Sequence, residues 1–383
     1  IEREKIYATT SMTDMNEQAQ SLKIGELSDG DARAIYKSME LDMRQYKHLR
    51  MFVHAEQLNE FDQYKKGDLS IFVRLGTDFT NNYYEYELPL TFTPWYTGYN
   101  NEELIWPESN NVDIDLEQLV KVKENRNAKI RANDLTVSST IPYHEIIDGK
   151  KMTVVGMPNI AGVKDLMIGI RNPKKQNIND NDDMLPKSAE IWINELRLTD
   201  FNRSGGWAAT GFARTNLADL GDVSLSASHR SAGFASLEQS ISEISQEAIT
   251  SLDFATNIEV GKFFPEDWGV RLPVHFDYSQ SVSNPKYNPL DPDVKLENDL
   301  LSYRTEAERD SIRHMVQDYV SRTNFNLMNI RKDRLGDRAL ERHFYDIENW
   351  NGSYSYASTY MRDVDIEYNS KEQHRGTLAY QYD

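Results

Sequence analysis

The stretch that decides the fold is IWINELRLTDFNRSGGWAATG, residues 191–211. Its first half alternates apolar and polar side chains and predicts a β-strand over 191–199. Residues 202–206, NRSGG, predict a tight turn, because Asn, Ser and Gly favour turn conformations. A second strand is expected to begin at Trp207. We interpret this stretch as the boundary between a water-soluble β-domain and a run of strands with a different environment.

Composition narrows the classes of protein to consider. The chain has 383 residues, enough for two or three units, with a net charge of −18 and no cysteine. Strong negative charge without a basic run excludes a phosphate-backbone binder, so we expect no nucleic acid partner. Without cysteine there is no disulfide framework, thiolate zinc site or cysteine nucleophile. No apolar run reaches the ~20 residues of a membrane helix, but membrane β-strands need to be apolar on one face only.

The two ends of the sequence do not resemble natural termini. The first five residues, IEREK, are charged and lack the apolar core of a signal peptide. The last residues, YQYD, lie inside a strand-like pattern. We therefore expect the chain to be a piece of a longer protein.

Residues 1–47 are predicted to form a linker and helical lead-in. The apolar residues Ala34, Ile35, Met39 and Met43 are spaced as on one face of a helix. Asp29 or Asp31 is the expected N-cap.

Residues 48–200 change to a period of two, which is typical of half-buried strands. The expected strands are 48–55, 69–75, 82–90, 152–155, 166–170 and 191–198, with an extended segment over 136–143 and a loop over 95–106. A short helix over 115–122 is expected to have Asp115 as its N-cap and to bury Leu116, Leu119 and Val120. About seven strands without βα alternation predict an antiparallel, jelly-roll-like β-sandwich.

Residues 201–383 contain longer alternating runs, several of them at least as long as the ~9–11 residues of a tilted membrane strand. A strand over 354–368 is expected to carry Tyr354, Tyr356, Tyr360, Val364, Ile366 and Tyr368 on one face. We interpret the region as transmembrane strands of a large outer-membrane β-barrel; a second soluble β-domain is the alternative. An insertion over 285–320 interrupts it. Its segment 285–293 holds three prolines and is expected to form no ladder, and 305–320 is expected to be a helix with a Thr305–Glu308 capping box.

The sequence contains no arrangement typical of an enzyme. The histidines are scattered, and nucleotide-binding and hydrolase motifs are absent. We therefore predict no catalytic, cofactor-binding or metal-binding residue. The acidic loop over 177–183 has oxygen ligands for a hard cation, but a solvated loop is the simpler interpretation. Glu85 and Glu87 lie on one face of a strand, where salt bridges within the sheet are a simpler interpretation than an acid–base pair.

Two other classes of function stay open. A carbohydrate-binding or adhesion module is suggested by a group of aromatic residues that could stack on sugar rings: Tyr83, Tyr84, Trp95, Tyr96, Tyr99 and Trp106. A glycoside hydrolase would need two carboxyl groups about 5–10 Å apart across a cleft.

Several stretches resemble one family, SprA (also called Sov), the outer-membrane translocon of type IX secretion and gliding motility. The matching segments are RMFVHAE (50–56), FVRLGTDF (72–79), NYYEY (82–86), WINELRL (192–198), GGWAA (205–209), NLADLG (216–221) and PKYNPLD (285–291). The resemblance implies a very large single-chain barrel through which folded cargo proteins leave the periplasm.

The resemblance also implies partners and a location. Expected partners are a PorV-like outer-membrane barrel, a periplasmic plug protein, secreted cargo proteins and membrane lipid. The expected location is the bacterial outer membrane. The chain would supply a sandwich and part of a passive pore wall whose polar inner face carries Arg214, Asp253, Glu259, Arg271 and Asp277.

Overall fold

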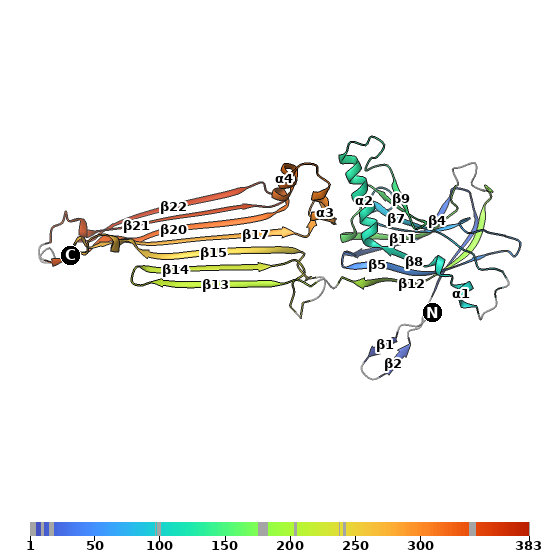
Figure 1. Cartoon of the computed structure of the whole chain (residues 1–383), viewed down its shortest axis with the longest axis horizontal. Helices are drawn as coiled ribbons and strands as arrows, with labels where there is room; N and C mark the ends of the chain where they lie inside the picture. Colours follow the sequence, from blue (N-terminus) through green and yellow to red (C-terminus); the bar gives the residue numbers. More distant parts are fainter. Residues whose placement is uncertain are drawn as a thin grey trace. The chain divides into compact units, whose positions relative to one another are not determined.

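The computed structural model describes residues 5–8, 11–14, 19–95, 97, 101–174, 183–202, 205–236, 238–239, 243–336 and 342–382. Strands hold 52% of the residues and helices 16%, which confirms the mainly β class. The sheets are antiparallel, and none of them closes on itself within the described residues. The chain divides into two compact units: unit 1 is 1–203 with 291–294, and unit 2 is 204–290 with 295–383 (Figure 1).

Unit 1 contains two sheets of four and six strands, with the orders β3-β12-β5-β8 and β4-β11-β6-β7-β10-β9. Their bounds are β3 Gln20–Leu27, β4 Ala32–Leu41, β5 Tyr46–Gln57, β6 Ser70–Gly76, β7 Tyr83–Pro89, β8 Val112–Asp115, β9 Tyr143–Ile147, β10 Lys150–Val155, β11 Val163–Arg171 and β12 Lys187–Phe201. The remaining elements are the hairpin β1 Lys5–Ala8 and β2 Ser11–Asp14, the helices α1 Glu102–Ile105 and α2 Leu116–Arg131, and the 3-10 turns η1 Glu108–Asn110 and η2 Ile160–Gly162.

The two sheets of unit 1 share one hydrophobic core. Val53 and Ile191 enter it from the four-stranded sheet, and Val73 and Val154 enter it from the six-stranded sheet. All four side chains are buried. Burying one such side chain contributes about 1.5–3 kcal/mol, so this core supplies the main stabilisation of unit 1. The expected strands of 48–200 are confirmed by β5, β6, β7, β10, β11 and β12.

Helix α2 crosses from one sheet to the other, because it contacts β5 and β8 as well as β9 and β10. Asp115 caps its N-terminus by accepting hydrogen bonds from the backbone N–H groups of Glu117 (2.9 Å) and Gln118 (3.2 Å). Leu119 and Val120 are buried. The predicted cap and buried face are confirmed, and the helix continues to Arg131.

The predicted helix with Ala34, Ile35, Met39 and Met43 is wrong. Most of that segment is strand β4, which pairs with β11 through Ile35↔Ile168 and its neighbours. The helical spacing of the apolar residues does not decide the conformation here, because the edge of β11 satisfies the backbone groups of the segment in a ladder. The expected loop over 95–106 contains the short helix α1, and in the segment 136–143 only Tyr143 belongs to a strand, β9.

Unit 2 is one long sheet with the order β13-β14-β15-β17-β20-β21-β22, and β16 pairs with β20 beside this path. The strand bounds are β13 Ala208–Leu217, β14 Gly221–Arg230, β15 Glu247–Glu259, β16 Val270–Arg271, β17 Pro273–Pro285, β20 Asp318–Lys332, β21 Trp350–Arg362 and β22 Asn369–Tyr380. The helices are α3 Leu296–Leu301 and α4 Glu306–Val316, with 3-10 turns η4 Val260–Phe263, η5 Glu266–Trp268 and η7 Ile347–Asn349.

Three expectations for residues 285–368 need correction. The segment 285–293 does take part in ladders, because β17 reaches Pro285, and β18 Tyr287–Asn288 pairs with β19 Asp291–Lys295. Prolines are tolerated there at a strand end and in a two-stranded edge. The helix over 305–320 ends at Val316, although its capping box is confirmed.

The third correction concerns the expected strand over 354–368. Strand β21 ends at Arg362, because the Asp363 carboxylate accepts hydrogen bonds from the backbone N–H groups of Asp365 and Ile366 and closes a turn. Ile366 and Tyr368 therefore lie outside the strand.

We predict that Asp115→Ala lowers the unfolding free energy of unit 1 by about 1 kcal/mol, because it removes the N-cap of α2. Urea denaturation followed by tryptophan fluorescence measures the change. The control is Gln118→Ala, an exposed position in the same helical turn. Equal stability of the two variants would contradict a capping role for Asp115.

Candidate functional site

The sheet of unit 2 has one mainly apolar and one mainly polar face. Polar residues on the mainly apolar face include Gln280, Arg362, Glu372 and His374. Directly paired residues lie on the same side of an antiparallel sheet, so the ladder register assigns each side chain to a face. Row by row, Leu225 pairs with Phe254, Phe254 with Tyr278, and Phe276 with Phe325. The apolar face carries Ala209, Ala213, Leu217, Val223, Leu225, Leu252, Phe254, Ile258, Val274, Phe276, Tyr278, Val282, Tyr319, Phe325, Leu327, Tyr354, Tyr356, Tyr360 and Leu378.

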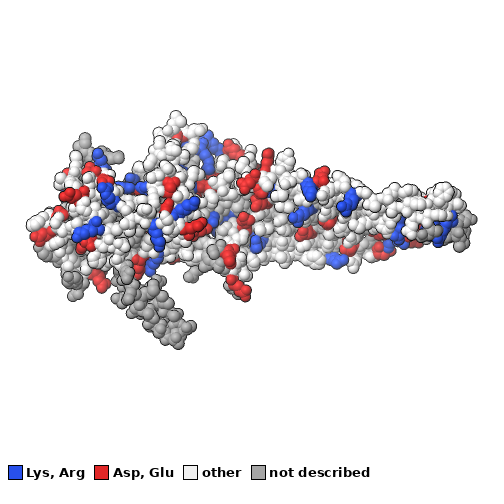
Figure 2. All heavy atoms as spheres, turned by 180° about the vertical axis from the view of Figure 1, so that it is seen from behind, with Lys and Arg blue, Asp and Glu red and all other residues white. Residues whose placement is uncertain are grey.

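The opposite face carries mainly hydroxyl, amide and charged side chains. Its members include Thr210, Arg214, Ser224, Ser226, Ser228, Ser251, Asp253, Asn257, His275, Asp277, Ser279, Ser281, Arg322, Asn324, Asn326, Ser355, Lys371, Gln373 and Arg375. Apolar exceptions on this face include Phe212, Ile249 and Val320. Figure 2 shows charged residues spread over unit 1, whereas long stretches of the strands of unit 2 are uncharged on the side in view.

The apolar face is not buried in a core. Leu225 is 43% exposed, Leu252 39% and Leu378 69%. The hydrophobic clusters of the described residues contain no member of β13, β14, β15, β17, β20, β21 or β22. A single sheet with an uncovered apolar face needs a covering phase or a partner, because such a surface in contact with water is unfavourable.

Aromatic pairs lie near both ends of the strands on the apolar face. At one end, the rings of Trp350 and Tyr380 lie 5.1 Å apart. At the other end, Tyr319 and Tyr360 lie 5.9 Å apart, and Trp207 lies on the His229 ring at 4.5 Å. These rows bracket the aliphatic and Phe side chains in the middle of the face.

The structure places most of the predicted inner-face residues together. Arg214, Asp253 and Asp277 are on the polar face, and Glu259 pairs with Pro273 at the end of the same ladder. Arg271 lies apart from them in β16, beside β20, where its guanidinium donates to Asp333 at 2.9 Å.

Glu85 and Glu87 of unit 1 are partners of arginines. The Arg171 guanidinium donates to both carboxylates, at 3.0 Å for Glu85, and Arg74 donates to Glu85 at 2.6 Å. Burial raises the pKa of the Glu85 carboxyl, but the hydrogen bonds and charges of Arg171 and Arg74 outweigh this and lower it below its ordinary value. Glu85 is therefore held ionised, and both carboxylates belong to a salt-bridge ladder, as the simpler interpretation of the sequence predicted.

The aromatic group expected for sugar binding is not one exposed platform. Tyr84 is buried in the core, and Tyr83 lies under the Arg74 guanidinium at 3.9 Å. Trp95 is exposed, whereas Trp106 packs beside the His54 ring. Tyr96, Tyr99 and residues 177–182 of the acidic loop lie outside the described residues.

Among the residues that the structure describes, no group of three or more His, Asp and Glu could hold a metal ion. No helix in the described part of the chain has the length and apolar character to cross a membrane.

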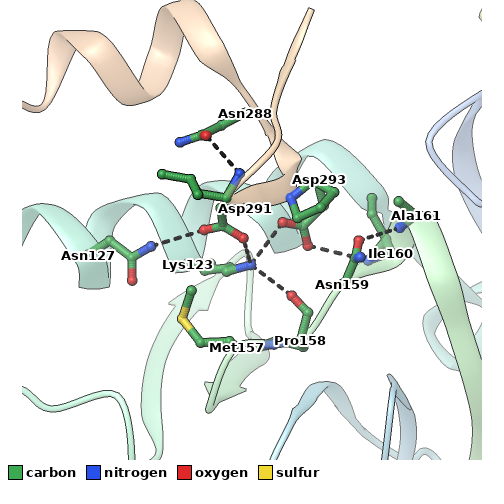
Figure 3. A network of polar contacts seen from close by, with 12 residues as sticks. Lys123, Asn127, Met157, Pro158, Asn159, Ile160, Ala161, Asn288, Asp291 and Asp293 are labelled. Atoms are coloured by element: carbon green, nitrogen blue, oxygen red, sulfur yellow. Dashed lines mark hydrogen bonds and ion pairs between the residues drawn. The ribbon is translucent and has the colours of Figure 1, made fainter. Parts of the chain in front are cut away.

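A buried charge cluster in unit 1 was not predicted. The Lys123 ammonium on α2 is fully buried and contacts the carboxylates of Asp291 and of Asp293, the latter at 2.8 Å (Figure 3). It also donates to the Pro158 carbonyl at 2.7 Å. A signal existed in the sequence, because Lys123 follows Leu119 and Val120 at helical spacing and so points toward the core.

These features define a mainly β protein with a two-sheet unit and a single-layer sheet that is apolar on one side. Residues 1–300 match the family SprA_N, described as a motility related/secretion protein. The chain therefore belongs to this family, which confirms the resemblance. The family relates the chain to motility and secretion. No curated protein matches the chain.

We predict that Arg171→Met destabilises unit 1 by about 3–5 kcal/mol at pH 7, because it leaves the buried Glu85 and Glu87 without their shared cation. Lys151→Met is the control, since Lys151 is 43% exposed and lies 4.0 Å from Glu87; its expected effect is about 0–1 kcal/mol. Urea denaturation measures both.

The pH dependence of this variant gives a second readout. The pKa of Glu85 is lower in the folded protein than in the unfolded chain, so its ionised form stabilises the wild-type fold at pH values above the ordinary carboxyl pKa. This stabilisation is lost as the pH falls through the lowered pKa. Arg171→Met should therefore reduce the stability loss on acidification. If the unfolding free energies of Arg171→Met and Lys151→Met differ by less than about 1 kcal/mol at pH 7, the salt-bridge ladder contributes little to stability.

Proposed function

We propose that this chain supplies wall strands of a protein-conducting pore in the bacterial outer membrane, through which folded cargo is exported in type IX secretion and gliding motility. The apolar face of the unit 2 sheet contacts lipid, and the polar face lines a water-filled lumen. One observation carries the proposal: the long sheet has a sorted apolar face that no hydrophobic cluster of the described residues covers. A second soluble β-domain would bury such a face in a core of its own.

The size of the apolar face supports this role. Trp350 and Tyr360 are ten residues apart on β21, which is about 34 Å along a strand that rises 3.4 Å per residue. At a strand tilt of about 40° the span is about 26 Å, close to the roughly 25 Å apolar band between the aromatic girdles of membrane barrels. The aromatic pairs at the two strand ends then lie at the two membrane interfaces.

The open edges of the sheet also fit a larger wall. All residues of β13 and β22 are exposed, and each of these strands has one strand partner in the described residues. Unpaired strand edges in lipid are costly, because their N–H and C=O groups find no water. We infer that further strands continue the sheet on both sides and close it into a barrel.

The mechanism we propose is passive. Hydroxyl and amide side chains of the polar face keep water in the lumen, and the energy for transport is supplied elsewhere. No covalent chemistry is assigned to the chain. From the family we further propose three kinds of protein partner: a PorV-like outer-membrane barrel, a periplasmic plug protein and the secreted cargo.

We also propose that unit 1 is an accessory jelly-roll sandwich. Its strand order supports this: β3-β12-β5-β8 and β4-β11-β6-β7 alternate between the two sheets as two Greek keys do, with β10 and β9 added at one edge.

The assignment of the two faces can be tested with single cysteines, because the sequence has none. Phe276→Cys and Asp277→Cys, neighbours on opposite faces, are each labelled with a small fluorophore in the membrane-reconstituted protein. We expect lipids with a doxyl quencher to quench the label at 276 and aqueous iodide to quench the label at 277. Strong quenching of both labels by iodide and of neither by lipid would refute the pore-wall proposal.

A charge on the apolar face should impair membrane assembly. We predict that Phe276→Arg lowers the amount of folded protein in the outer-membrane fraction several-fold, because an arginine facing the middle of the bilayer costs about 2–4 kcal/mol. Asp277→Arg on the polar face should leave that amount within about twofold of wild type. Equal effects would contradict the assignment of the faces.

A further inference from the structure

Residues Asp291–Val294 occupy an unusual place in the chain. The residues before and after them belong to unit 2, but these four residues belong to unit 1. They are separated by 87 residues, 204–290, from the rest of unit 1 in the sequence. The segment, DPDV, therefore completes the fold of a unit to which its sequence neighbours do not belong.

Each of the four residues contacts other residues of unit 1. Asp291 contacts Lys123, and the Pro292 carbonyl accepts a hydrogen bond from the Arg44 guanidinium at 3.1 Å. Asp293 accepts from Lys123 at 2.8 Å. Val294 is 2% exposed and belongs to the hydrophobic core.

Two further groups hold the Asp293 carboxylate. The Tyr84 hydroxyl donates to it at 2.7 Å. The backbone N–H of Ile160 donates at 3.3 Å (Figure 3). Asn127 on α2 donates to Asp291 at 3.4 Å. The site thus recognises an acidic residue, a carbonyl, a second acidic residue and a small apolar side chain in consecutive positions.

We propose that Asp291–Val294 is a latch: a segment of unit 1 that docks reversibly in a site formed around Lys123. Water reaches the segment at Asp291, whose side chain is 13% exposed, whereas Asp293 and Val294 are buried.

The charges around Asp291 make the latch sensitive to pH. Lys123 and Arg126 face it from α2, Tyr84 faces it from β7, and Asp293 belongs to its own segment. The Arg126 guanidinium donates to the Gly156 carbonyl at 2.7 Å. Among the described residues, Lys123 makes the direct ion pairs with the two carboxylates.

Burial first, and the charge of Asp293 second, raise the pKa of Asp291 to about 6 against the attraction of Lys123. A raised carboxyl pKa means that docking favours the protonated form. The contribution of this protonation to docking is complete at pH values below the ordinary carboxyl pKa of 3.8, and it is lost as the pH rises through about 6. Docking should therefore be about tenfold tighter at pH 5.0 than at pH 7.5.

Hydrogen exchange of the full chain tests the latch. Mass spectrometry follows peptides that cover residues 286–297, with protection factors corrected for the intrinsic exchange rate at each pH. In the wild type we expect about tenfold higher protection at pH 5.0 than at pH 7.5. Asp291→Asn, which keeps the shape but cannot titrate, should remove this difference and protect the segment at pH 7.5 at least as well as the wild type.

Lys123→Met is expected to reduce protection of the segment at least tenfold at pH 7.5, because it leaves the buried Asp293 and the partly buried Asp291 without their cation. The matched control is Lys121→Met on the same helix, where the side chain is 61% exposed; it should leave protection unchanged. If Lys123→Met prevents folding, the proposal is tested by comparing the pH dependence of protection in the wild type and in Asp291→Asn. Wild-type protection that does not change with pH, or an Asp291→Asn variant that keeps the wild-type pH dependence, would overturn the latch.

Discussion

The alternation of side chains along paired strands is the constraint on which both units depend. Each strand sends successive residues to opposite sides, so one face of every sheet must find a partner for its apolar side chains. In unit 1 the two sheets solve this by facing each other around Val53, Val73 and Ile191. In unit 2 one sheet carries Leu225, Phe254 and Phe276 on a face without such a second layer. The same rule therefore yields a buried core in one unit and an exposed apolar face in the other.

Charges have different roles in the two units. In unit 1 they are paired and partly buried, as in the Arg171 ladder on the six-stranded sheet and the Lys123 cluster beside α2. These pairs fix which strands and segments meet, because a mispaired register would leave a buried charge without its partner. In unit 2 most charges of the strands lie on the hydrophilic face among serines and asparagines, where water can solvate them, and Arg362 and Glu372 lie on the other face.

Much of the fold could be predicted from local patterns. Period-two runs located β5, β6 and β7, and Asp115 marked the start of α2, because both signals depend on residues close together in the sequence. Strand β4 was missed since its apolar residues fit a helix equally well, and only the edge of β11 decides between the two. The end of β21 was missed because one carboxylate, that of Asp363, closes the chain into a turn. The inward face of α2 hinted at a buried Lys123, but its partners are 168 and 170 residues away, beyond any local pattern.

The late position of Asp291–Val294 in the sequence has a consequence for biogenesis. A polypeptide emerges from its N-terminus, so every strand of the two-sheet unit is made before these four residues appear. Until then α2 holds an ammonium without its counter-ions, and the core lacks Val294. The two-sheet unit thus reaches its final form only after β13 to β17 have been made. Folding of unit 1 is therefore completed later than synthesis of the first strands of unit 2.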